Sequence, residues 1–357
     1  MDINLKKDKM TKDERWVALL KRKPMDRIPV YGWAAGFSAV NTGLSIADFY
    51  NDVQKSYDCQ NQTAAKFGFQ ELPGTGYAAF GGWEFGGEIK WPSGEFAQAP
   101  TVMKHPVETE EDVWKLEVPD VKDAGIVPLM FEIAKIAEND GSTYIMGFVQ
   151  GPFTTAGNLG GADKLIKWTM KKPEIAHHLL RLSTDFLTKL AQYWADTFGP
   201  ERMQIMGAEP LASNQVISPK QFEEFALPYI KETHENILAT GIKHIHMHIC
   251  GEQNENLPFW TQVTFGYPGI VSFGHEVDLE TASKYFPDTI IMGNVEPALF
   301  QAGTPEQVYE ATKVCIKKGR KHPGGFMLAP GCEMPPMAPE ENVWAMMQAV
   351  SDFGWYE

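Results

Sequence analysis

Short apolar runs alternate along the chain with amphipathic stretches of helical spacing. The runs end at glycine or at polar residues, which is typical of buried strands, and the stretches between them are typical of helices. This alternation predicts an α/β protein, and a (β/α)8 TIM barrel better than a doubly wound sheet. The predicted strands are 26–33, 67–72, 144–149, 203–209, 244–250, 270–275, 289–294 and 325–330, and the predicted helices are 11–23, 46–67, 109–114, 125–138, 164–169, 173–194, 218–239 and 340–353.

The pattern predicts one domain over residues 1–357, with a helical extension at 1–25 and an insertion at 73–102. The insertion follows the second predicted strand and is rich in Gly, Trp and Phe. Within it, 87–91 and 95–97 flank Pro92-Ser93-Gly94, which predicts a β-hairpin. We expect this hairpin to lie over the functional site, either contacting the substrate or serving as a cover packed by aromatic side chains.

Three histidines and a cysteine share one face of the predicted strand 244–250, because every second side chain of a strand points the same way. His248 and Cys250 can therefore offer two ligands to one metal ion. Cys332, where another apolar run meets a Gly/Pro break, can offer a third. Three protein ligands with an open fourth position are typical of catalytic zinc. The alternative is a buried strand with hydrogen-bonded histidines and an inert cysteine.

Composition narrows the class of function. The net charge of -14 disfavours binding to nucleic acid or to an anionic membrane, since either needs a basic face. The 4 cysteines are too few for a disulfide scaffold in 357 residues, which favours metal binding, catalysis or simple burial for them. No apolar run is long enough to span a membrane, and the charged start lacks the apolar run of a secretory signal, so we expect a cytoplasmic protein.

In a TIM barrel, chemistry takes place at the C-terminal ends of the strands. Polar residues with useful chemistry gather at or near the predicted strand ends. They are Glu71, Gln150, Glu209, His248, Cys250, His275, Asn294, Glu296 and Cys332. Their shared position is a stronger indication of a site than any one of them alone.

The motifs of the chain resemble those of the uroporphyrinogen decarboxylase superfamily, and within it the zinc-dependent, corrinoid-linked methyltransferases typified by methylcobamide:coenzyme M methyltransferases. The resemblance covers nearly the whole chain, and its most specific part is His-x-Cys with a distant Cys. The matching segments are 26–30, 151–154, 217–222, 248–251, 293–297, 331–336 and 339–342. The resemblance implies zinc ligands at His248, Cys250 and Cys332.

The resemblance also implies methyl transfer between a small thiol or methylated substrate and a corrinoid such as methylcobalamin. The chain has no Asp-x-His-x-x-Gly corrinoid motif, so the corrinoid is expected on a partner protein. An alternative is transfer from a methyl ether or methanol to Co(I). Porphyrinogen decarboxylation is disfavoured, because the loop 31–38 has no arginine to hold a polycarboxylate. A non-catalytic binding protein would be expected to have lost a zinc ligand.

Other residues take secondary roles in this hypothesis. Glu209 is the candidate acid or fourth zinc ligand, with helix capping as the alternative, and His275 is a candidate for orienting a ligand, with a core histidine as the alternative. His244 and His246 are expected to be structural, and Cys59 and Cys315 to be bystanders. Asn294 and the aromatic residues Trp33, Phe37, Trp83 and Phe153 are candidates for contact with the corrin, although aromatic packing would also explain the latter.

Overall fold

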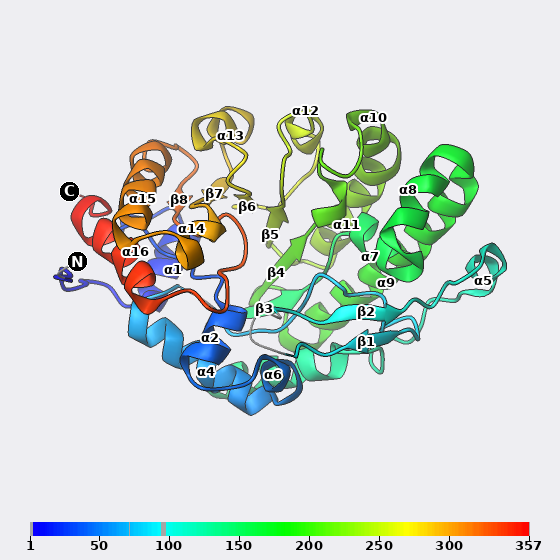
Figure 1. Cartoon of the computed structure of the whole chain (residues 1–357), viewed down its shortest axis with the longest axis horizontal. Helices are drawn as coiled ribbons and strands as arrows, with labels where there is room; N and C mark the ends of the chain where they lie inside the picture. The colour runs from blue at the N-terminus through cyan, green and yellow to red at the C-terminus, as the bar shows by residue number, and fades with distance from the viewer. Residues whose placement is uncertain (1–2, 71, 94–97, 357) are drawn as a thin grey trace. The chain divides into compact units, whose positions relative to one another are not determined.

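The computed structural model describes residues 3–70, 72–93 and 98–356. The chain forms two compact units (Figure 1). Unit 1 consists of Met1–Pro73, Ser93–Gln98 and Ile270–Glu357, and unit 2 of Gly74–Pro92 and Ala99–Gly269. Strands β3, β4 and β5 pair in chain order in unit 2, and strands β6, β7 and β8 pair in chain order in unit 1, with parallel registers in both. This arrangement of parallel strands and intervening helices confirms the predicted α/β class.

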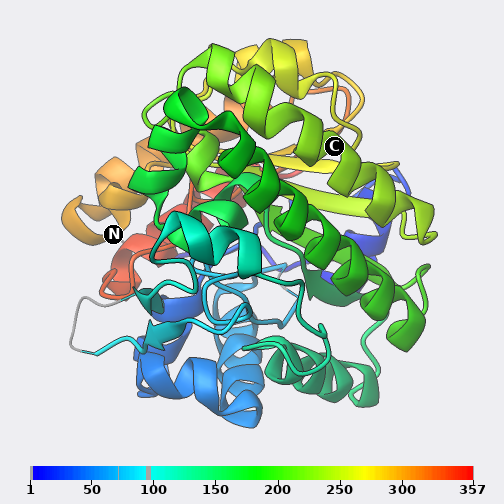
Figure 2. The same ribbon diagram turned by 90° about the vertical axis from the view of Figure 1, so that its right-hand side faces the viewer.

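Unit 2 contains three of these strands, and their side chains are almost all buried. Gln204 of β4 pairs with His244 of β5, and Ala208 pairs with His248, so the register between the two strands is continuous. Helix α9 packs against α7 and α11 (Figure 2). The elements are β1 Glu88–Lys90, β2 Thr101–Lys104, α5 Glu110–Lys115, α6 Val127–Asn139, β3 Ile145–Phe148, α7 Pro152–Gly160, α8 Ala162–Lys171, α9 Pro173–Phe198, β4 Met203–Ala208, the 3-10 helix η1 Pro210–Ala212, α10 Pro219–Gln221, the π-helix η2 Phe222–Ala226, α11 Leu227–Ala239, β5 His244–Ile249 and α12 Leu257–Trp260.

Unit 1 contains the other three parallel strands and most of the N-terminal third of the chain. Its elements are α1 Lys12–Leu20, α2 Ala35–Asn41, α3 Ile46–Asn51, α4 Val53–Phe67, β6 Ile270–Phe273, α13 Leu279–Tyr285, β7 Ile290–Met292, α14 Pro297–Ala302, α15 Pro305–Gly319, β8 Phe326–Met327 and α16 Glu340–Phe353. The first predicted strand is reduced to a parallel bridge between Val30 and Leu328, and the second to a hydrogen bond from the Gln70 amide to the Val30 carbonyl.

Three differences from the sequence-based elements have physical causes. The predicted helix 46–67 breaks at Asp52, whose carboxylate caps α4 by accepting the Lys55 amide. Helices α2 and α7 were not predicted, because their runs of Gly, Ala, Ser and Thr carry no clear helical period. In the insertion, β1 pairs antiparallel with β2 at 101–104. The predicted second arm at 95–97 lies outside the described residues.

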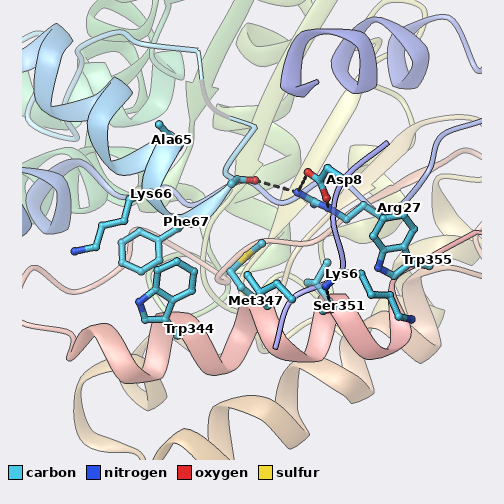
Figure 3. Close-up of a pocket in the computed structure, with 13 residues that line it drawn as sticks. Lys6, Asp8, Arg27, Ala65, Lys66, Phe67, Trp344, Met347, Ser351 and Trp355 are labelled. Atoms are coloured by element: carbon cyan, nitrogen blue, oxygen red, sulfur yellow. Dashed lines mark hydrogen bonds and ion pairs between the residues drawn. The ribbon is translucent and has the colours of Figure 1, made fainter. Parts of the chain in front are cut away.

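The segment before α1 is fixed to the rest of unit 1 by polar contacts. The Asn4 amide donates to Gln348, and the Lys6 amide donates to Ser351, both on α16. The Arg27 guanidinium binds Asp8 at 2.7 Å and 2.8 Å and also donates to the Gly68 carbonyl, beside a cavity of about 200 Å³ (Figure 3). None of the described helices is both long enough and apolar enough to cross a membrane.

Candidate functional site

The end of β5 carries the first two predicted ligands. His248 is the fifth residue of the strand and is 1% exposed, while Cys250 follows the last strand residue and is half-buried. The next residue, Gly251, has a φ of +70°, a left-handed conformation that glycine adopts at little cost. The chain therefore turns sharply after Cys250.

A buried glutamine holds the turn after Cys250. The Gln253 side chain is 0% exposed and donates to the Cys250 carbonyl at 3.0 Å and to the Ala212 carbonyl at 3.4 Å. Its side-chain oxygen accepts hydrogen bonds from Asn256 and from the Trp260 indole, each at 3.0 Å. Buried polar groups that are fully satisfied in this way rigidify their surroundings. Sequence reasoning missed Gln253, because a glutamine in a polar loop has no distinguishing pattern.

Cys332 lies after β8 in a loop whose backbone is fixed within unit 1. The Gly331 amide donates to the Val295 carbonyl at 2.7 Å, and the Met334 amide donates to the Trp33 carbonyl at 2.8 Å. A Cβ at Gly331 would lie 2.8 Å from the His275 amide nitrogen, so only glycine fits there without a backbone shift. The Glu333 carboxylate accepts the Gly36 amide of α2 at 3.1 Å. The contacts of Gly331, Glu333 and Met334 therefore fix the backbone before and after Cys332.

The three predicted ligands can serve a single ion. The imidazole of His248 and the thiols of Cys250 and Cys332 have ligand atoms that all lie within 4.8 Å of one another. Two thiols and one imidazole form a donor set that zinc accepts, and three protein ligands leave room for a fourth from the substrate. The donor chemistry and the separation of these atoms therefore fit zinc.

The Glu209 carboxylate caps helix α7. It is 0% exposed and accepts the Phe153 amide at 2.8 Å, the Thr154 amide at 3.0 Å and the Thr154 hydroxyl at 2.8 Å. A Cβ at Gly151 would lie 2.1 Å from this carboxyl group, so glycine is needed beside it. Burial raises the pKa of Glu209 to about 7, although the three hydrogen bonds oppose the rise. The hydrogen bonds match the helix-capping alternative, and the pKa leaves a proton available near neutral pH.

His275 and Asn294 follow β6 and β7 in unit 1. The His275 side chain is 42% exposed, and its Nδ1 lies 3.5 Å from the Glu276 carboxylate. The Asn294 side chain donates to the carbonyls of Gly274, at 2.9 Å, and Val277, at 2.6 Å. Asn294 therefore fixes the loop after β6, and both of its amide hydrogens are used in doing so.

The aromatic candidates differ in exposure. Phe37 is 2% exposed and Phe153 is 0% exposed, so both pack in the core, as the packing alternative expects. Trp33 and Trp83 are half-buried, and Trp33 has a φ of +45°, a strained conformation for a bulky residue. Such strain is often found at functional sites, which favours Trp33 among the four as a contact residue.

The remaining polar residues near the strand ends lie in different environments. Gln150 is buried, and its side-chain oxygen accepts the amides of Gly151 and Ala208. Glu296 is exposed at the start of α14, and Glu71 lies outside the described residues. Burial, with a smaller contribution from the charge of His248, lowers the pKa of His246 to about 3. His246 is therefore neutral at physiological pH.

Known proteins resemble this chain over nearly its whole length. The Uroporphyrinogen decarboxylase (URO-D) family model matches residues 11–353. The methylcobamide:CoM methyltransferase MtbA of Methanosarcina acetivorans is 29% identical over 349 residues, which cover 96% of this chain and 98% of that protein. MtbA of Methanosarcina mazei is 25% identical over 352 residues, which cover 96% and 98%.

A solved structure of a methyltransferase from Methanosarcina mazei has the same fold, with a TM-score of 0.80 over 97% of this chain and 99% of that one, at 23% identity. The family match spans nearly the whole chain, and the relatives that match it at full length are methyltransferases. The chain therefore belongs to the uroporphyrinogen decarboxylase (URO-D) family and is an enzyme, a methyltransferase.

Proposed function

We propose that the protein is a zinc-dependent methyltransferase that moves a methyl group between a corrinoid, carried by a separate protein, and a small thiol or methylated substrate. The names of the full-length relatives, methylcobamide:CoM methyltransferases, support the corrinoid and the thiol. The observation that carries the proposal is the grouping of one imidazole and two thiols within 4.8 Å, at His248, Cys250 and Cys332.

These three residues would bind the ion, and their own chemistry sets its character. Zinc held by two thiolates and one imidazole would lower the pKa of a bound thiol while keeping the thiolate nucleophilic. Other residues of the chain hold these ligands in place. Gln253 fixes the carbonyl of Cys250, and the contacts of Gly331 and Glu333 fix the backbone on either side of Cys332. Ligands that are held in this way need little reorganisation when a substrate arrives.

A thiol acceptor with a methyl-corrinoid donor fits this ligand set best. The opposite direction, from a methyl ether or methanol to Co(I), needs an acid that protonates the leaving oxygen. Glu209 is the candidate, because its pKa of about 7 keeps a proton on a fraction of the molecules near neutral pH. Its three accepted hydrogen bonds favour the carboxylate and oppose that role.

Metal analysis tests the zinc and cobalt spectroscopy tests the transfer. We expect about one zinc ion per purified chain, and its loss in Cys250→Ser/Cys332→Ser. We also expect the wild-type protein to change the absorption spectrum of methylcobalamin when a thiol is added, or of cob(I)alamin when a methyl ether is added. A Cys59→Ser variant, changed at a buried cysteine on α4, is the control that keeps both properties. Zinc content that is unchanged in the double variant contradicts the proposal.

A further inference from the structure

We propose that unit 1 contains a binding site for a small carboxylate with a single aromatic ring, separate from the proposed zinc site. It is the cavity of about 200 Å³ between the N-terminal segment, the end of α4 and α16 (Figure 3). The ligand is distinct from the methyl-transfer substrate, so the site does not depend on the proposed function. Three features of the cavity support it: its place in the fold, its apolar wall and its unpaired positive charge.

The cavity lies away from the proposed zinc ligand of unit 1. Val30 and Leu328 form a parallel bridge, so the residues that precede them lie at one end of this pair and the residues that follow them at the other. Arg27, in the cavity wall, precedes Val30, whereas Cys332 follows Leu328. Active sites of TIM barrels lie at the end where strands finish. A ligand in the cavity would therefore occupy the opposite end of unit 1 from Cys332.

One side of the cavity is apolar and aromatic. Phe67 of α4 and Trp344 of α16 lie with their ring centroids 4.6 Å apart, and Met347 lies beside them (Figure 3). Phe67 and Met347 are buried, so this wall is part of the core of unit 1. In another protein an apolar cavity of about 150 Å³ holds benzene. A cavity of about 200 Å³ therefore has room for one aromatic ring with a small substituent.

The other side of the cavity is polar and carries positive charge without a matching acid. Arg27 and Asp8 neutralise each other through hydrogen bonds of 2.7 Å and 2.8 Å. Lys6, also in the wall, and Lys9 form no ion pair with any residue that the structure describes. The Nζ atoms of both lysines lie about 6 Å from the centroid of the Trp355 ring, at 5.9 Å each. Two ammonium groups at one ring with no carboxylate between them favour an anion.

A buried serine adds a hydrogen-bond donor to the polar side. Ser351 of α16 lines the cavity, is 5% exposed and accepts the Lys6 amide at 2.8 Å. Its own hydroxyl hydrogen has no acceptor among the described residues, so it is available to a carboxylate oxygen. Lys66, on the aromatic side, is already paired with Glu340 at 2.5 Å. The Lys6 ammonium and the Ser351 hydroxyl are therefore the groups expected to hold the carboxylate.

The two sides together define the class of ligand. A neutral aromatic molecule would make no use of the Lys6 ammonium, and a small inorganic anion would leave the apolar wall uncovered. A carboxylate with one ring uses both, with the ring against Phe67, Trp344 and Met347 and the carboxylate beside Lys6 and Ser351. Pockets that combine an apolar wall with a few polar groups in this way are typical of small-molecule sites.

Calorimetric titration of the full-length protein with benzoate, benzamide and acetate tests the ligand class. Benzamide keeps the ring and is neutral, so we expect benzoate to bind at least about tenfold more tightly, because a carboxylate accepts stronger hydrogen bonds. Acetate keeps the charge and lacks the ring, so we expect it also to bind at least about tenfold more weakly than benzoate. If benzoate does not bind, or if benzamide or acetate binds as tightly as benzoate, the proposal is wrong.

The variant Ala65→Trp locates the site. Ala65 is an exposed residue of α4 in the cavity wall, so a large side chain there narrows the cavity without entering the core. Gln62→Trp, at an exposed position of the same helix outside the wall, is the matched control. We expect the affinity for benzoate to fall at least about tenfold in Ala65→Trp and to stay unchanged in Gln62→Trp. Equal affinities in the two variants would place benzoate elsewhere and overturn the proposal.

The variant Lys6→Gln isolates the charge. We expect it to lower the affinity for benzoate about fivefold and to leave the affinity for benzamide unchanged, because only benzoate pairs with the ammonium. Lys7→Gln, at the next residue and outside the wall, is the control that binds benzoate as the wild type does. Circular dichroism verifies that each variant is folded, and if Ala65→Trp is not, Lys6→Gln still decides the outcome. Wild-type affinity for benzoate in Lys6→Gln would contradict the proposed recognition of an anion.

Discussion

The end of β5 and the loop after β8 supply ligands to the same proposed ion but position them by different means. At β5, strand geometry alone places His248 and Cys250 on one face, because they are two residues apart. Cys332 has no ligand neighbour in sequence, and its place depends on Gly331 fitting against the His275 backbone and on the carboxylate of Glu333.

The difference shows which kind of support each ligand needs. A pair of ligands on a strand is positioned by regular backbone, so its weak point is the turn that follows, where Gln253 supplies the hydrogen bonds. A single ligand in a loop depends on every close contact of the loop backbone. We therefore expect the β8 loop to be more sensitive than the β5 turn to small changes beside its cysteine.

The largest expected effect on zinc affinity is that of Gly331→Ala, and Gly251→Ala is the matching change beside the other cysteine. In Gly331→Ala the new Cβ meets the His275 backbone nitrogen at 2.8 Å, so Cys332 must move, and we expect zinc affinity to fall about 100-fold. In Gly251→Ala the new Cβ meets the end of the Gln215 side chain at 2.9 Å, which can rotate away, so the main cost is the positive φ. Competition with a chromophoric chelator measures both. A larger loss in Gly251→Ala would reverse the comparison.

An intermediate effect is expected from Gln253→Leu. The change removes both donors to the carbonyls of Cys250 and Ala212 and leaves the Trp260 indole without its acceptor, so zinc affinity should fall about tenfold. Gln262→Leu, at an exposed position after the same α12, is the matched control and should bind zinc as the wild type does. Zinc affinity that is equal in the two variants would show that Gln253 stabilises the fold without positioning Cys250.

The smallest effect on zinc is expected from Glu209→Gln, which should instead change the pH dependence of stability. Burial raises the pKa of Glu209 from 4.5 to about 7, so the protonated form is favoured by folding. Its contribution to the free energy of unfolding is complete below pH 4.5 and is lost as the pH rises through about 7, a decrease of about 3 kcal/mol. Urea unfolding across this range should show the decrease in the wild type and a flatter profile in Glu209→Gln. An identical decrease in both proteins would show that groups other than Glu209 cause the loss of stability.

Much of the architecture could be predicted from periodicity. The predicted helix 11–23 is present as α1, which begins with a capping box of Thr11 and Glu14. The apolar alternation located β3 to β7 within a few residues, because their burial leaves a clear pattern. The barrel's first two strands were harder to delimit, since at Val30 and Gln70 they are reduced to single pairings. Helix α7 was missed because its small residues are selected by close packing, such as that of Gly151 against Glu209.

The sequence by itself determined the types of the proposed ligands and the pairing of His248 with Cys250, because strand periodicity is local and a two-residue spacing leaves little freedom. Only the tertiary structure decided that Glu209 caps α7, that Gln253 holds the Cys250 turn and that Glu333 reaches α2. These contacts join residues that are far apart in the chain or lie in loops without a repeating pattern, so no local spacing encodes them.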